Sequence, residues 1–189
     1  MDDGEAMSAQ PPRSTFSATL RRPARTGDGE AWCFVVLPRE VSDTLPRRGR
    51  CTVAGSLNGQ PFQATLEPDG QLSHWLPLSE TFCAGAEAQA GDTVVLEIAP
   101  VATEPEPQVP ADLQQALHAA PAALSVWQAT TPLARLDWIH WIESAKQART
   151  RSKRIDDACA MLASGKKRVC CFDPSGFYSK ALRAPDAAD

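Results

Sequence analysis

The sequence contains no long hydrophobic run, and this excludes a large class of proteins. None of its 189 residues lies in an apolar stretch approaching the roughly 18 residues that a membrane-spanning helix requires. The first residues, MDDGEAMSAQPPR, are acidic and lack the apolar segment of a secretory signal. We therefore predict a cytoplasmic protein that does not insert into a membrane.

Several motifs of enzymes and metal proteins are also missing. The sequence has no phosphate-binding P-loop, no dinucleotide fingerprint and no nucleophile elbow around any serine. None of its six cysteines forms a Cys-x-x-Cys pair, which excludes a zinc ribbon or a thioredoxin-type motif. We predict no catalytic residues, no metal and no cofactor, and we expect all six thiols to be free.

The composition is that of an ordinary globular protein, with 43% hydrophobic and 22% charged residues. The net charge of −4 hides an asymmetry between the two halves. Residues 1–107 carry 8 basic and 15 acidic side chains, a net charge of −7. Residues 108–189 carry 11 basic and 8 acidic side chains, a net charge of +3. The two halves therefore either have different partners or attract each other.

Apolar residues alternate along the first half, with the period of a strand that has one buried face. The pattern predicts six strands, near residues 16–20, 32–37, 51–55, 62–66, 72–78 and 93–99. Asn58-Gly59 and Asp69-Gly70 are typical of tight hairpin turns, since such turns favour residues that tolerate positive φ. Short strands separated by regular turn signals indicate a small barrel or a sandwich.

The second half changes to a helical period after an acidic segment that contains two prolines. Residues 101–109 (VATEPEPQV) are predicted to be a linker. Beyond it, Pro110 and Thr131-Pro132 are typical helix beginnings, and Gly165 is a typical helix end. We place a barrel domain at 14–100, a helical domain at 110–168, and disordered tails at 1–13 and, for the most part, 169–189.

Motifs in both halves resemble known families. The order W-x-F-V-x-L-P (32–38), V-x-G-S-L-N-G-x-P-F (53–62) and G-D-x-V (91–94) resembles a bacterial and archaeal domain of unknown function with a double-split β-barrel fold. The second half resembles the bacteriocin-protection, YdeI or OmpD-associated family. It does so through V-P-x-D-L-x-x-A-L (109–117), W-I-x-x-A-K (141–146), T-R-x-x-R-I (150–155) and L-A-S-G-K (162–166).

These resemblances imply a fold and a cellular context. The expected fold class is α+β with two domains, in which a small N-terminal β-barrel of the double-split type precedes a small all-α domain. The second family is linked to envelope stress and antimicrobial-peptide resistance, without an established activity or catalytic residues.

The most informative charged group is a basic cluster at the junction of two predicted helices. It consists of Lys146, Arg149, Arg151, Lys153 and Arg154. Cations near a helix N-terminus oppose the helix dipole, so this placement favours an external anion. Phosphate, nucleic acid or an acidic protein surface fits this chemistry, although no interleaved aromatic residues support single-strand stacking. The alternatives are a solvated face or docking onto the acidic barrel.

Cys170 and Cys171 form a second candidate site. Lys166, Lys167 and Arg168 precede them, and such cations lower the pKa of a thiol and favour the reactive thiolate. We consider these residues possible reactive thiols, with incidental free thiols as the alternative. His118 and His140 are predicted to be partly exposed, and His74 to face the barrel interior.

Two function classes remain open. The first is a non-catalytic binding or interaction protein whose helical domain presents the basic cluster. The second is a small-molecule enzyme with a pocket between the barrel and the helical domain. Two titratable groups within hydrogen-bond reach in such a pocket would favour the enzyme.

Overall fold

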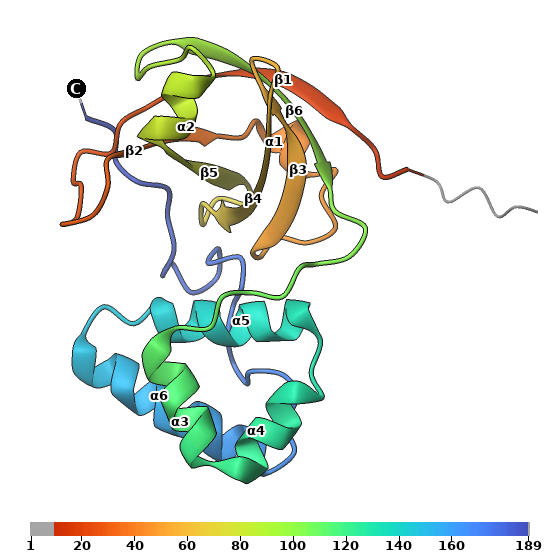
Figure 1. Cartoon of the computed structure of the whole chain (residues 1–189), viewed down its shortest axis with the longest axis vertical. Coiled ribbons are helices and arrows are strands. Elements are labelled where there is room, and N and C mark those ends of the chain that lie inside the picture. The colour runs from red at the N-terminus through yellow and green to blue at the C-terminus, as the bar shows by residue number, and fades with distance from the viewer. Residues whose placement is uncertain (1–9, 189) are drawn as a thin grey trace, which may run out of the picture.

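The computed structural model describes residues 10–188. The predicted disordered tail at 1–13 falls mostly on residues 1–9, which lie outside the described residues. The first half forms one antiparallel sheet with the strand order β1-β6-β3-β4-β5-β2, curved into a half-barrel (Figure 1). Its strands are β1 (Ser14–Thr19), β2 (Trp32–Val36), β3 (Cys51–Leu57), β4 (Gln60–Pro68), β5 (His74–Ser79) and β6 (Thr93–Pro100). The predicted positions of the strands are confirmed.

The alternating apolar residues build the core inside this sheet. On β6, Val94, Leu96 and Ile98 point inward, and they meet Val53 and Leu57 of β3. The intervening side chains of β6 are more exposed, as expected for a sheet with one wet face. Two short helices, α1 (Arg39–Ser42) and α2 (Glu80–Gly85), lie within this half. Residues 14–100 are called the sheet unit below.

Two glycines have defined roles in the pairing of β3. Gly59 has φ +85° and follows Asn58 with φ +47°, which confirms the predicted tight turn between β3 and β4. Gly55 lies against β6, where a Cβ atom would come within 1.8 Å of the carbonyl oxygen of Glu97. The close approach of β3 and β6 therefore requires glycine at this position.

The second half contains four helices around a separate core. They are α3 (Ala111–Ala119), α4 (Pro121–Gln128), α5 (Pro132–Glu143) and α6 (Ala148–Ala163), called the helical unit below. Trp138 of α5 is fully buried, together with Leu113, Ile142 and Leu162. The Thr131 hydroxyl caps α5 by accepting a hydrogen bond from the Ala134 amide at 3.2 Å.

The predicted fold class, a small barrel followed by a small all-α domain, is wrong in that form. The six strands make a half-barrel, because β1 and β2 do not pair with each other. Only Arg21, two residues beyond β1, forms an isolated bridge with Phe34 of β2. Helices occur in both halves, and the described chain beyond α6 is a segment of turns and irregular structure that returns to the sheet unit (Figure 1). Alternation along a strand predicts which face is buried, but it does not say whether the edge strands pair.

Residues 170–188, called the C-terminal segment below, run back to the sheet unit and contact it through their backbone. The Ala24 amide donates to the carbonyl of Asp186 at 2.7 Å, and the Ala188 amide donates to the carbonyl of Arg22 at 2.8 Å. Gly70 allows the backbone of Leu182 to pass closely, since a Cβ there would lie 2.0 Å from the Leu182 carbonyl oxygen. The C-terminal segment is therefore packed against the sheet unit.

Candidate functional site

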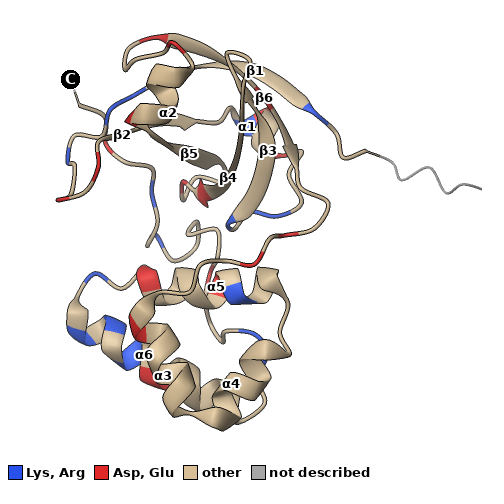
Figure 2. Ribbon diagram, in the orientation of Figure 1, with Lys and Arg blue, Asp and Glu red and all other residues tan. Residues whose placement is uncertain are grey.

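The structure places the basic cluster within the first two turns of α6 and just before it. Figure 2 shows several Lys and Arg segments grouped at the beginning of this helix. Lys146 and Arg149 are exposed, and they form no ion pair within residues 10–188. Lys153 is exposed and pairs with Asp157 on the next turn, at 2.7 Å.

The two remaining arginines of the cluster are used inside the helical unit. Arg151 donates two hydrogen bonds to the Asp112 carboxylate of α3, at 2.7 and 3.0 Å, and these bonds lower the pKa of Asp112. Arg154 donates to the carbonyl of Trp141 and, at 2.9 Å, to the Ser144 hydroxyl. Its guanidinium lies 5.4 Å from the centre of the Trp141 ring.

The structure brings Cys170 and Cys171 together. Both are exposed, and their Sγ atoms lie 3.1 Å apart. The expectation of a lowered thiol pKa is wrong for Cys171. A hydrogen bond with Cys170 raises the pKa of Cys171, and the nearby Lys166 opposes this only in part.

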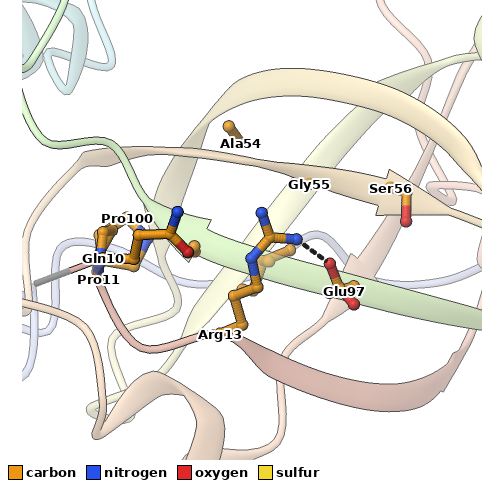
Figure 3. A pocket seen from close by; sticks show the side chains of 10 residues that line it. Gln10, Pro11, Arg13, Ala54, Gly55, Ser56, Glu97 and Pro100 are labelled. Carbon is orange, nitrogen blue, oxygen red and sulfur yellow. Dashed lines mark hydrogen bonds and ion pairs between the residues drawn. The ribbon is translucent and has the colours of Figure 1, made fainter.

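A hollow on the sheet unit is lined by the chain leading into β1 and by residues of β6 and β3. Figure 3 shows Arg13 pointing across it toward Glu97, with which it forms an ion pair. Gly55 and Ser56 of β3 lie on the other side. Its charged lining amounts to one exposed ion pair, which marks no chemistry beyond a surface contact.

Ion pairs join the sheet unit to the helical unit. Arg47 pairs with Asp137 of α5 at 2.7 Å. Arg50 pairs with Glu143 of α5 at 2.7 Å and with Glu67 of β4 at 2.9 Å. The signs are the reverse of those expected from the net charges, because the acidic half supplies the arginines. Burial raises the pKa values of Asp137 and Glu67, against the effect of their arginine partners.

A pocket of about 380 Å³ lies beside the first of these ion pairs. This junction pocket is lined by Arg47, Thr131, Leu133, Ala134, Asp137, Arg168, Val169, Phe172 and Pro174. Gly49 makes room at its edge, since a Cβ there would lie 2.7 Å from Pro174 and 2.8 Å from the Arg47 guanidinium. The pocket thus combines residues from the sheet unit, the beginning of α5 and the C-terminal segment.

His140 lies close to the junction pocket, and the prediction that it is partly exposed is wrong. Its side chain is 3% exposed and makes an edge-on contact with Phe172 at 5.1 Å between ring centres. Burial lowers the pKa of His140 to about 3, helped by the charges of Arg50 and Arg47. Its Nδ1 atom has no hydrogen-bond partner within the described residues. His118 is exposed, as predicted.

His74 confirms its predicted inward position. It is fully buried and joins three segments, with Nε2 lying 3.0 Å from the carbonyl oxygen of Gly49 and Nδ1 hydrogen-bonded to the Ser42 hydroxyl. Burial lowers the pKa of His74.

The sequence reasoning missed the residues that meet at the junction. Arg47, Arg50 and Asp137 lie far apart in the chain, and each is an ordinary charged residue in its own segment. One signal was available: the basic run from Arg47 to Arg50 stands out in an acidic half. Within residues 10–188, no group of three or more His, Cys, Asp or Glu side chains could hold a metal ion.

Two family comparisons match the two halves of the chain. Residues 16–98 match the domain of unknown function DUF1905. Residues 106–165 match the family described as bacteriocin-protection, YdeI or OmpD-associated. The two matches follow each other in tandem along the chain. No curated protein matches it.

The boundaries of the two matches fit the structure. The DUF1905 domain covers most of the sheet unit, and the YdeI/OmpD-associated domain covers all four helices of the helical unit. The described residues contain no helix long and apolar enough to cross a membrane. Arg168, Val169, Phe172 and Pro174 of the junction pocket lie beyond both matches, so this wall of the pocket belongs to neither family pattern.

Proposed function

We propose that the protein is a non-catalytic binding protein whose junction pocket holds a small anion of the carboxylate or phosphate type. The observation that carries this proposal is that two arginines, Arg47 and Arg168, line one pocket of about 380 Å³. That volume lies within the range of small-ligand sites. Guanidinium groups match the planar geometry of carboxylates and the oxygen atoms of phosphates.

The beginning of α5 adds to the positive character of the pocket. Thr131, Leu133 and Ala134 of this end line it. Pro132 has no N–H and the Ala134 amide already donates to the Thr131 hydroxyl, so the Leu133 amide and the helix dipole are what favour an anion there. Leu133 and Phe172 offer apolar contact for the carbon atoms of a short organic acid.

The two arginines are not equivalent. Arg47 is already paired with Asp137 at 2.7 Å, whereas Arg168 forms no ion pair within residues 10–188. Arg168 is therefore the main anchor for an anion. Since burial raises the pKa of Asp137, this carboxyl gains its proton more readily than an exposed one as the pH falls. Its protonation releases Arg47, so binding should become tighter with decreasing pH.

Calorimetric titration with inorganic phosphate and with malonate at low salt tests the proposal. We expect Arg168→Gln to weaken binding about tenfold or more, the loss of one charge-assisted contact. The matched control is Lys166→Gln, which removes an exposed cation two residues away that does not line the pocket. Equal losses in both variants, or no heat with the wild-type protein, would contradict the proposal.

One observation favours a second candidate function, a small-molecule enzyme. Asp137 is a pocket carboxyl with a raised pKa, within hydrogen-bond reach of Arg47, and such groups occur at catalytic sites. Mass spectrometry of the small molecules that copurify with the protein would supply a candidate substrate. A change in its mass during incubation, lost in Asp137→Asn, would favour the enzyme over the binding protein.

The family descriptions suggest the setting of this binding. One domain belongs to a family described by bacteriocin protection and by association with OmpD, and we infer a role connected with the cell envelope and its stress. We also propose the cytoplasm as the location, supported by six free cysteines, which suit a reducing compartment. An acidic protein surface or nucleic acid remains the alternative partner for Lys146 and Arg149.

A further inference from the structure

Cys170 and Cys171 form an exposed pair at the beginning of the C-terminal segment. Their Sγ atoms lie 3.1 Å apart. In an extended chain, neighbouring side chains point to opposite faces. Here Cys171 has a left-handed backbone with φ +59°, uncommon for a residue other than glycine, and the two sulfur atoms lie together.

The other cysteines lie in different surroundings. Cys33, Cys51 and Cys83 are buried in the sheet unit, and Cys159 is half-buried on α6. An oxidant in solution therefore meets the adjacent pair first. The positive charge of Lys166, which only partly opposes the raised pKa of Cys171, helps to attract anionic reagents to this place.

We propose that Cys170 and Cys171 are a reversible redox site, which closes to a disulfide between adjacent residues when a small-molecule disulfide oxidises them. One thiolate of the pair attacks a sulfur of the small disulfide, forming a mixed disulfide and expelling half of the reagent as a thiolate. The neighbouring thiol then gives up its proton and attacks the sulfur of the modified cysteine. This forms the ring and expels the second half.

The exchange is balanced between the protein and the reagent. Two electrons pass from the cysteine pair to the small disulfide, and the two protons pass to the two thiolates that leave. The second step needs no encounter between molecules, because the two sulfur atoms lie 3.1 Å apart before the reaction begins.

The ring formed in this way is easy to reduce. Adjacent Cα atoms are about 3.8 Å apart across a trans peptide, shorter than the usual separation in disulfides. Such strain favours the reduced form, and exposed, strained disulfides are the labile and regulatory ones. The pair therefore responds to redox conditions and does not serve as a structural crosslink.

Ring closure acts on residues of the junction pocket. Val169 and Phe172, the direct neighbours of the pair, both line that pocket, and Phe172 also contacts His140. Oxidation should therefore move the wall of the pocket. The redox step itself does not depend on the proposed anion binding, and it is tested separately.

To test the proposal, the full-length protein is treated with oxidised glutathione, and the remaining thiols are then blocked with N-ethylmaleimide. The tryptic peptide 169–180 is examined by mass spectrometry. Both cysteines of the pair, and no others, lie in this peptide. The wild-type peptide should lose two hydrogen atoms, carry no maleimide and return to the dithiol with reduced glutathione. Cys170→Ser and Cys171→Ser should each keep one stable glutathione adduct, since neither variant has a second thiol to close the ring.

Cys159→Ser is the matched control, and its peptide 169–180 should behave as in the wild-type protein. A wild-type peptide that keeps stable glutathione adducts would overturn the proposal. So would a wild-type peptide that takes up maleimide at both cysteines after the treatment.

Discussion

Arg154 lies against the C-terminal end of α5, where helix carbonyl groups have no partner within the helix. It donates to the Trp141 carbonyl and the Ser144 hydroxyl, and its guanidinium stacks near the Trp141 ring. Arg151 holds Asp112 of α3 in a similar way, with two hydrogen bonds. These two arginines of the basic cluster therefore stabilise neighbouring helices, in addition to any role with an external anion.

We predict that Arg154→Gln lowers the free energy of unfolding by about 1–2 kcal/mol, because hydrogen bonds from a charged donor and a stacking contact are lost. The control Arg149→Gln removes an exposed cation without an ion pair in the described chain, and it should change stability by less than about 0.5 kcal/mol. Urea unfolding measures both values. Equal stability of the two variants would show that the contacts of Arg154 contribute nothing.

His140 makes stability depend on pH. Its folded pKa is about 3, below the ordinary value of 6.5, so the unfolded chain binds a proton that the folded chain rejects. The contribution is complete above pH 6.5 and is lost as the pH falls toward 3, by about 1.4 kcal/mol per unit.

His140→Phe should flatten this part of the profile. The difference between wild-type and variant stability, measured by urea unfolding from pH 7 to pH 4, isolates His140 from His74, whose pKa is also lowered. Parallel profiles for the two proteins would show that His140 is not the cause.

At the scale of elements, the contact between β3 and β6 gives the sharpest stability prediction. Gly55→Ala places a Cβ 1.8 Å from the Glu97 carbonyl oxygen, so the strands must separate locally, and we expect a loss of about 1–3 kcal/mol. Gly85→Ala on α2 meets no atom within 4 Å and should be neutral or stabilising by up to about 1 kcal/mol. Thermal unfolding of both variants checks this, and equal melting temperatures would contradict it.

The strands and helices could be predicted because their apolar periods are regular. Val94, Leu96 and Ile98 alternate in β6, and Thr131-Pro132 marks the beginning of α5. The half-barrel could not be predicted, because the edge pairing through the bridge at Arg21 has no sequence pattern. The course of the segment after α6 could not be predicted either, since its contacts with the sheet unit are backbone hydrogen bonds and close glycine approaches.

The candidate sites could be predicted from the sequence only where their residues are neighbours in the chain. The basic cluster on α6 is visible as a run in the sequence, and so is the cysteine pair. The junction pocket depends on Arg47, Asp137 and Arg168, which three separate segments supply. Their meeting is a property of the folded chain, and no local spacing encodes it.

At the scale of the whole molecule, we predict that the sheet unit folds without the rest of the chain. A fragment of residues 14–100 keeps the complete sheet and its apolar core. It should unfold cooperatively, at a lower temperature than the full chain, because the pairs of Arg47 and Arg50 with α5 and the contacts of the C-terminal segment are missing. Calorimetry of the fragment tests this, and a broad, non-cooperative transition would contradict it.

The central claim is that a small anion binds where the two units and the C-terminal segment meet. The most direct measurement is a titration of the full-length protein with inorganic phosphate, followed by NMR of the arginine side chains and the backbone amides. We predict saturable shifts of the Arg47 and Arg168 side chains and of the Leu133 and Ala134 amides, with Arg149 unchanged. Shifts confined to the beginning of α6, or no saturable shift at the junction pocket, would contradict the claim.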